Sequence, residues 1–161
     1  TQTVGEALTE KIATIGENMN IRRFVRIESS GAMTDYIHAA GKIGVLIDAE
    51  APNTDEVQEC LRNVAMQIAS MNPVSVSRND VPKEIVEKEF EIARDKAREE
   101  GKPEAMLDKI AEGRLNKFYK ESCLLEQEFI MDPALTIEKY LKGVDADLTV
   151  TAFKRVNLNV D

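Results

Sequence analysis

The chain has 161 residues, of which 43% are hydrophobic and 31% are charged, and its formal net charge is −8. This balance is typical of a globular domain that buries its own core, and it excludes an intrinsically disordered segment. The negative charge argues against direct binding to nucleic acid, because phosphates repel it at long range.

Cysteine and histidine are too few and too scattered to build a metal site. Cys60 and Cys123 lie far apart in the sequence, and His38 is the single histidine. We therefore expect no metal, no cofactor, and reduced thiols in a cytosol-like compartment. We also expect no membrane segment, since no apolar run approaches the roughly 18 residues that span a bilayer.

The first third of the chain predicts one helix followed by three short strands. Apolar residues recur every three or four positions in residues 5–15, which indicates a helix. Residues 21–28 (IRRFVRIE) largely alternate in polarity and predict a strand with one dry and one wet side. Residues 33–39 and 43–49 predict two more strands around a turn at 40–42, so that the three strands form an antiparallel meander.

Residues 55–71 carry the clearest helical pattern in the chain. The apolar stripe consists of Val57, Cys60, Leu61, Val64, Ile68 and Met71. Asn72 and Pro73 end this helix, and a loop over 73–82 leads to Pro82, a residue suited to the first turn of another helix.

Residues 83–121 predict a pair of helices with a charged surface. Of these 39 residues 21 are charged, with acidic and basic side chains interleaved. Two narrow apolar seams run beneath the charges, separated by Gly101–Lys102–Pro103. The seam residues are Val86, Phe90, Ala93 and Ala97, then Leu107, Ala111, Leu115 and Phe118. The pattern predicts an antiparallel helical hairpin that buries only its seam and protrudes from the core.

The C-terminal part predicts an extended stretch, a helix and a final strand. Residues 123–133 are expected to be extended, and 136–143 to form a short helix that Thr136 caps and Gly143 ends. Residues 147–160 alternate in polarity and predict a strand that pairs with the earlier ones. The residues expected on one face of this strand are Leu148, Val150, Ala152, Val156 and Leu158.

Together these elements predict an α+β fold. A small antiparallel sheet has helices packed on one face, and an antiparallel helical hairpin is inserted into the chain. We expect residues 1–81 and 122–161 to form the core, and residues 82–121 to form the protruding coiled-coil hairpin.

The residues show no catalytic constellation, and we expect no enzyme. Arg22, Arg23 and Arg26 could bind an anionic partner, although the wet face of a strand explains them more simply. His38 precedes three small residues, Ala39, Ala40 and Gly41. It could be a half-buried histidine satisfied by its neighbours, or it could be presented where a partner's backbone approaches closely. The residues alone leave both alternatives open.

Six stretches, in order over nearly the whole chain, resemble the bacterial-type elongation factor Ts family. They are IGENMNIRR (15–23), YIHAAGKIGVL (36–46), VAMQIASMNP (64–73), IVEKEF (85–90), GKPE (101–104) and IAEGRLNKFYKESCLLEQEFIMDP (110–133). The resemblance implies a guanine-nucleotide exchange factor that binds the GTPase elongation factor Tu and promotes release of GDP. It also implies the cytoplasm of a bacterium, or an organelle of bacterial descent.

The resemblance assigns partner contact to the region of the histidine. The residues so assigned are Tyr36, Ile37, His38, Ala39, Ala40 and Gly41. Many relatives have glycine where this chain has Ala40, and we expect alanine to be tolerated there unless the position needs a positive φ. The family's hairpin reaches toward the partner's nucleotide domain or supports self-association, so a homodimer is an alternative.

The chain also departs from the family pattern. It contains no TDF tripeptide, whereas the family carries a TDFV-type motif that wedges between helices near the nucleotide's magnesium, and begins with a small helical domain. We therefore expect this chain to be the partner-docking and dimerisation part, with weak exchange activity alone. The alternative is a purely structural self-association module.

Overall fold

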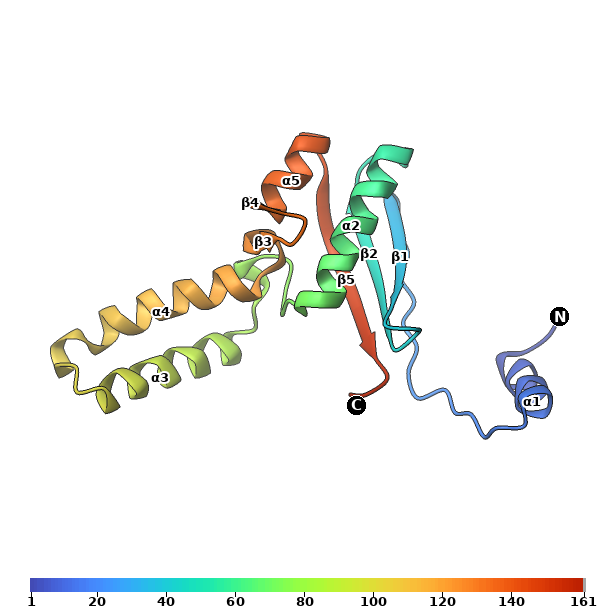
Figure 1. The fold of residues 1–161 in the computed structure, drawn as a ribbon, viewed down its shortest axis with the longest axis horizontal. Coiled ribbons are helices and arrows are strands. Elements are labelled where there is room, and N and C mark those ends of the chain that lie inside the picture. The colour runs from blue at the N-terminus through green and yellow to red at the C-terminus, as the bar shows by residue number, and fades with distance from the viewer. Residues whose placement is uncertain (161) are drawn as a thin grey trace.

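A three-stranded antiparallel sheet stands at the centre of the computed structural model, which describes residues 1–160 (Figure 1). Strands β1 (Ala32–His38) and β2 (Ile43–Glu50) form a hairpin, and β5 (Thr149–Asn157) pairs with the other side of β2. The sheet order is therefore β1-β2-β5. The expected pairing of the final strand with the earlier ones is confirmed.

Helix α2 (Asp55–Met71) covers one face of this sheet, with the predicted bounds. The Thr54 hydroxyl caps it by accepting a hydrogen bond from Val57 N at 3.2 Å. The predicted stripe is buried from Val57 to Ile68, where it forms the main core with the inner residues of the strands. Met71, at the end of the stripe, is 47% exposed, so its predicted place in the core is wrong.

Helix α5 (Ile137–Val144) completes the helical layer beside α2. The predicted cap is confirmed, because Thr136 Oγ1 accepts a hydrogen bond from Lys139 N at 3.3 Å. The prediction that Gly143 ends the helix is wrong, since the helix continues to Val144 and is followed by Asp145 in an extended conformation.

The segment before α5 is less extended than predicted. It begins with a 3₁₀ turn at Leu124–Glu126 and then forms a small two-stranded sheet, β3 (Glu128–Phe129) and β4 (Asp132–Thr136). The Phe129 ring stacks on Tyr140 of α5 with 4.2 Å between ring centres, which fixes this sheet against the core.

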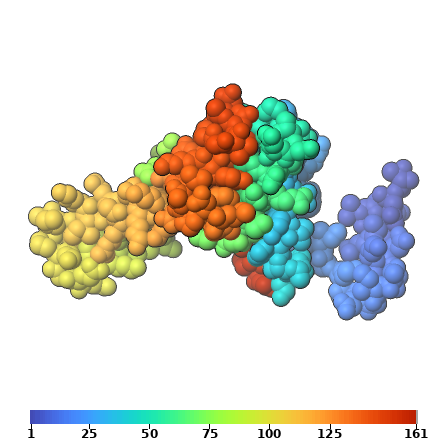
Figure 2. Space-filling view, turned by 45° about the horizontal axis from the view of Figure 1, so that its top comes forward, coloured from blue at the N-terminus to red at the C-terminus, as the bar shows by residue number. Residues whose placement is uncertain are grey.

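The predicted helical hairpin is present, and it projects from one side of the core (Figures 1 and 2). It consists of α3 (Lys83–Glu99) and α4 (Leu107–Ser122), with short 3₁₀ turns at Arg78–Asp80 and Glu104–Met106. Only its seam is buried. The buried seam residues are Ala93, Ala97, Leu107 and Ala111.

Helix α1 (Val4–Ile15) lies apart from the core, on the side away from the hairpin (Figures 1 and 2). Between it and β1, the predicted strand at 21–28 is wrong, because residues 18–29 have no regular secondary structure. A strand needs a hydrogen-bonded neighbour, and within residues 1–160 no segment pairs with this one. The expected three-stranded meander is therefore a two-stranded hairpin completed by β5.

The predicted inner face of β5 is correct only for its first part. A β-bulge shifts the register of β2 and β5 between Asp48 and Ala49. Beyond the bulge, the side chains of β5 that simple alternation places on the inner face lie on the outer face. Phe153 then packs against the core, while Val156 (36% exposed) and Leu158 (58% exposed) face solvent. The predicted inward positions of Ala152, Val156 and Leu158 are therefore wrong, because Ala152 pairs with Asp48 on the outer face and only Leu148 and Val150 of the predicted set are buried.

Candidate functional site

The loop between β1 and β2 stands at one end of the sheet and holds three consecutive residues in the left-handed conformation. Ala39, Ala40 and Gly41 have φ angles of 52°, 53° and 89°. Lys42 N closes the turn by donating to Ala39 O at 3.2 Å. Ala40 has a positive φ. This is the one case in which, from the sequence, we did not expect alanine to be tolerated. The two alanines store strain that glycine would not.

Replacing Ala40 with glycine is expected to raise the free energy of unfolding by roughly 0.5–1 kcal/mol, because glycine adopts a positive φ without the Cβ clash. Urea denaturation followed by circular dichroism measures the change. Ala105→Gly is the matched control, since Ala105 is exposed and is not among the residues with positive φ. An Ala40→Gly variant less stable than the parent chain would contradict the assignment of strain.

His38 ends β1 and is half-buried on the sheet's inner face. Its Nδ1 lies 3.1 Å from the hydroxyl of Tyr36, which is also on the inner face and packs against the core. Ile37, between them, points to the opposite face and is 62% exposed. The histidine is thus held by a neighbour at the foot of an exposed loop, which combines features of both alternatives drawn from the sequence.

The end of β5 lies beside this loop and contributes apolar residues that the sequence pattern had placed in the core. Leu158 N donates to Lys42 O at 2.8 Å. Val156 is the partner of Gly44 in β2, and Gly44 is the partner of Ile37 in β1. Ile37, Val156 and Leu158 are all exposed here. We call residues 36–41 together with Val156 and Leu158 the loop surface.

The arginines before β1 have partners within the chain. Arg22 donates to the carbonyl of Leu158 at 2.6 Å, and Arg23 donates to the carbonyl of Val160 at 2.8 Å. Arg26 forms an exposed ion pair with Glu28. Arg22 and Arg23 therefore tie the N-terminal segment to the C-terminal end of the chain, beside the loop surface.

Neither cysteine lies at a reactive site. Burial raises the pKa of the Cys60 thiol to about 11, and burial also raises the pKa of Cys123. Cys123 Sγ lies 3.6 Å from the Ser75 hydroxyl, and both side chains are buried. Both cysteines are free thiols that pack as small apolar residues.

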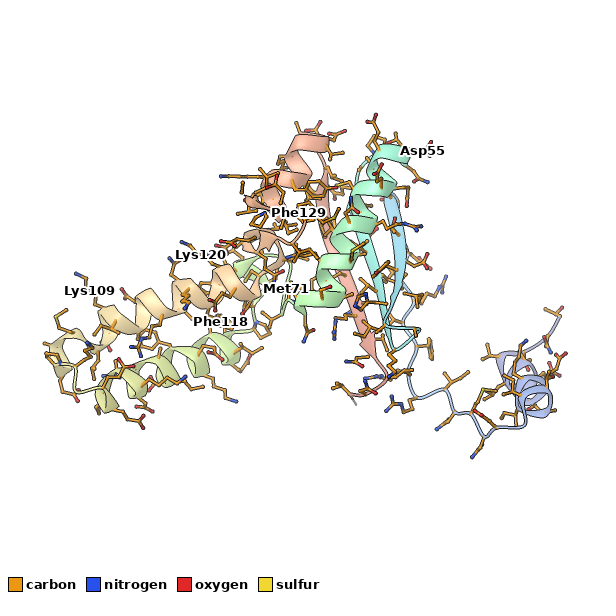
Figure 3. All side chains as sticks on the ribbon, in the orientation of Figure 1. Asp55, Met71, Lys109, Phe118, Lys120 and Phe129 are labelled. Carbon is orange, nitrogen blue, oxygen red and sulfur yellow. The ribbon has the colours of Figure 1, made fainter. Side chains whose placement is uncertain are left out.

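A groove of about 890 Å³ lies where α4 meets β3, β4 and α5. Met71, Lys120 and Phe129 mark it in Figure 3. Its charged residues are lysines and glutamates in mixture, which favours neither an anion nor a cation. Within residues 1–160, no cluster of His, Cys, Asp and Glu side chains could hold a metal ion. In the same part of the chain, no helix combines the length and apolar character needed to cross a membrane.

Comparison with known proteins gives a consistent family. The family model described as "Elongation factor TS" matches residues 1–160. Elongation factor Ts of Syntrophotalea carbinolica is 46% identical over 98% of this chain and 54% of its own length. That of Azobacteroides pseudotrichonymphae is 46% identical over 97% and 56%, and that of Clostridium botulinum (type A) is 44% identical over 94% and 52%.

This chain spans about half the length of the curated relatives that it matches. The match nevertheless runs through the sheet, the helical hairpin and the loop surface alike. The chain belongs to the elongation factor Ts family.

Proposed function

We propose that this chain is the part of an elongation factor Ts that docks on the GTPase elongation factor Tu, and that the loop surface makes the contact. The observation that carries the proposal is the exposed turn of small residues at Ala39–Gly41, flanked by the exposed side chains of Ile37, Val156 and Leu158. Small side chains let a partner's backbone approach closely, and clustered exposed apolar residues are typical of interfaces.

The neighbours of His38 support its role as a contact residue. The hydrogen bond between Tyr36 and His38 and the packing of Tyr36 on the core hold the imidazole in place before a partner arrives. A side chain that is already ordered loses less rotamer freedom on binding, so its contacts add more to affinity. Its place beside the loop lets it contact a partner without exposing the core.

Nucleotide exchange is a matter of differential binding rather than of bond chemistry. An exchange factor must bind the nucleotide-free GTPase more tightly than the nucleotide-bound form, and this difference sets the acceleration of release. We infer that residues 1–161 dock but couple weakly to the nucleotide, because they carry no TDF tripeptide to act as the family's wedge. The function is that of a binding protein, not of an enzyme.

The proposal places the protein in translation, in the cytoplasm of a bacterium. Bacterial relatives support this setting over an organelle of bacterial descent. The predicted division into a core of residues 1–81 and 122–161 and a hairpin of residues 82–121 fits a docking protein with two exposed parts, and it remains a proposal.

Direct titration of the chain into nucleotide-free elongation factor Tu tests the proposal. Isothermal titration calorimetry is expected to show saturable binding, and the same titration into another translational GTPase is expected to show none. Absence of binding to elongation factor Tu would overturn the assignment of the partner.

Self-association is the second candidate function, and the sheet favours it at one position. β1 is an edge strand, with β2 as its single neighbour in the sheet of residues 1–160. The free edge of β1 could pair with β1 of a second copy. Sedimentation velocity of the chain alone measures self-association, and titration into elongation factor Tu measures partner docking, so the two experiments separate the two functions. A chain that stays monomeric at all concentrations would contradict the second candidate.

A further inference from the structure

The chain passes twice between the core and the hairpin, and the two passages are bonded to each other. Val74 N donates to Ser122 O at 2.8 Å, Leu124 N to Ser75 O at 2.9 Å, and Leu125 N to Val76 O at 3.0 Å. We call residues 74–78 and 122–127 the neck. These three backbone hydrogen bonds limit twisting of the hairpin relative to the core. Side chains must supply the remaining restraint on bending.

Arg78 binds both the returning passage and the hairpin. Its guanidinium donates two hydrogen bonds to the Glu126 carboxylate, from Nε at 3.0 Å and from Nη2. Nη2 also donates to Asn116 Oδ1 at 3.2 Å, and the guanidinium carbon lies 4.7 Å from the centre of the Tyr119 ring. Asn116 and Tyr119 belong to the core end of α4, where Figure 3 labels Phe118 and Lys120. One planar side chain thus fixes three groups at once.

Gln127 makes a matching connection on the inner side of the neck. It is 2% exposed, and its Nε2 donates to Glu121 O in the last turn of α4 at 2.9 Å. Its Oε1 accepts from Gln67 of α2 at 3.2 Å. Consecutive residues therefore hold the hairpin in two ways. Glu126 does so through an ion pair near the surface, and Gln127 does so through a buried amide that donates to a backbone carbonyl of α4.

We propose that Arg78 is a positioning residue that holds the helical hairpin at a fixed angle to the core, so that hairpin and loop surface meet a partner as one rigid unit. The fixed angle is argued from the contacts of Arg78 across the neck, and only its consequence for a partner rests on the proposed function. The side chains of Arg78 and Glu126 are 42% and 24% exposed. Because exposed ion pairs add little to folding stability, losing Arg78 should loosen the hairpin without unfolding the chain.

Spin labels on the hairpin and the core measure this angle directly. We would introduce Lys109→Cys near the far end of the hairpin and Arg62→Cys on the exposed side of α2 (Figure 3 labels Lys109). Cys60 and Cys123 are buried, so the label should react with the introduced thiols only, as the unsubstituted chain will verify. Pulsed electron–electron double resonance is expected to give one narrow distance distribution.

The variant Arg78→Met keeps the length of the side chain and removes its charge and donors, and it is expected to broaden that distribution. Arg78→Lys keeps the charge without the planar fork and should give an intermediate width. Arg98→Met is the matched control, because Arg98 pairs with Asp95 and Glu104 at the far end of the hairpin. A distribution in Arg78→Met as narrow as in the parent, with the same mean, would overturn the proposal.

Affinity for elongation factor Tu, measured on the same variants, tests the consequence for a partner. Weaker binding by Arg78→Met than by Arg98→Met is expected. Equal affinity with a broadened distribution would overturn the claim that the fixed angle matters to a partner. If neither the parent chain nor any variant binds, the proposed function is overturned. The positioning role of Arg78 would then still be tested by the distances between the spin labels.

Discussion

Replacing Gln67 with leucine is expected to destabilise the fold by about 2–4 kcal/mol, although leucine is the more hydrophobic side chain. Gln67 is fully buried on α2 and donates to Gln127 Oε1 at 3.2 Å and to Glu128 O at 3.0 Å. Its own Oε1 accepts from Ile130 N at 2.9 Å. Leucine would leave Gln127 Oε1, Glu128 O and Ile130 N without this partner. A polar group that is removed from water and lacks a hydrogen bond lowers the free energy of unfolding.

Urea denaturation of the Gln67→Leu variant checks this expectation. Ile68→Leu is the matched control, because Ile68 is the next residue on the same helix, is equally buried and is replaced by a residue of similar volume. The free energy of unfolding of the control should fall by less than about 1.5 kcal/mol. A Gln67→Leu variant as stable as the control would mean that the buried amides contribute no net stability.

Replacing His38 with glutamate is expected to lower affinity for elongation factor Tu at least about tenfold, or about 1.4 kcal/mol. The substitution removes the ring that Tyr36 holds and places a carboxylate at the foot of the loop surface. A charge that must lose its water at an interface without a partner weakens binding. Isothermal titration calorimetry against nucleotide-free elongation factor Tu measures the loss.

The control for this prediction introduces the same charge at the other end of the sheet. Ala146 is exposed in the loop between α5 and β5, at the end of β5 remote from Asn157 and the loop surface. Ala146→Glu should bind as the parent chain does. Equal losses of affinity in His38→Glu and Ala146→Glu would mean that general charge repulsion, and not the loop surface, accounts for the weaker binding.

The sequence predicted those parts of the fold whose patterns are local and long. The stripe of α2 and the two seams of the hairpin repeat over several turns, so their periods identify helices before any tertiary contact is known. Gly101 and Pro103 separated α3 from α4, and Gly101 adopts a φ of 76° as a helix-ending glycine does.

Features that depend on a distant partner were predicted poorly. Residues 21–28 alternate as a strand does, yet no pattern within them reveals whether a neighbour exists to complete their hydrogen bonds. The bulge opposite Asp48 likewise leaves no clear mark in the sequence, and it reversed the face assigned to Val156. Strand formation and strand facing are properties of a pair, whereas helices satisfy their own backbone.

The candidate site was predicted only in part, because some of its residues are placed by the pairing of strands. The contiguous residues 36–41 were found from the sequence because the strand, the histidine and the small turn lie together. Val156 and Leu158 were missed, since only the shifted register of β5 brings them to the surface. Gln67 could have been found as a polar residue on an otherwise apolar stripe.

The central claim is that these 161 residues dock on elongation factor Tu but need more of the exchange factor to expel its nucleotide. Stopped-flow release of a fluorescent GDP analogue from elongation factor Tu, with the chain titrated in and binding followed in parallel, tests it most directly. We expect binding to saturate while the release rate rises little above its intrinsic value. Release that accelerates in step with binding would contradict the claim, and would mean that docking through the loop surface and the hairpin distorts the nucleotide site by itself.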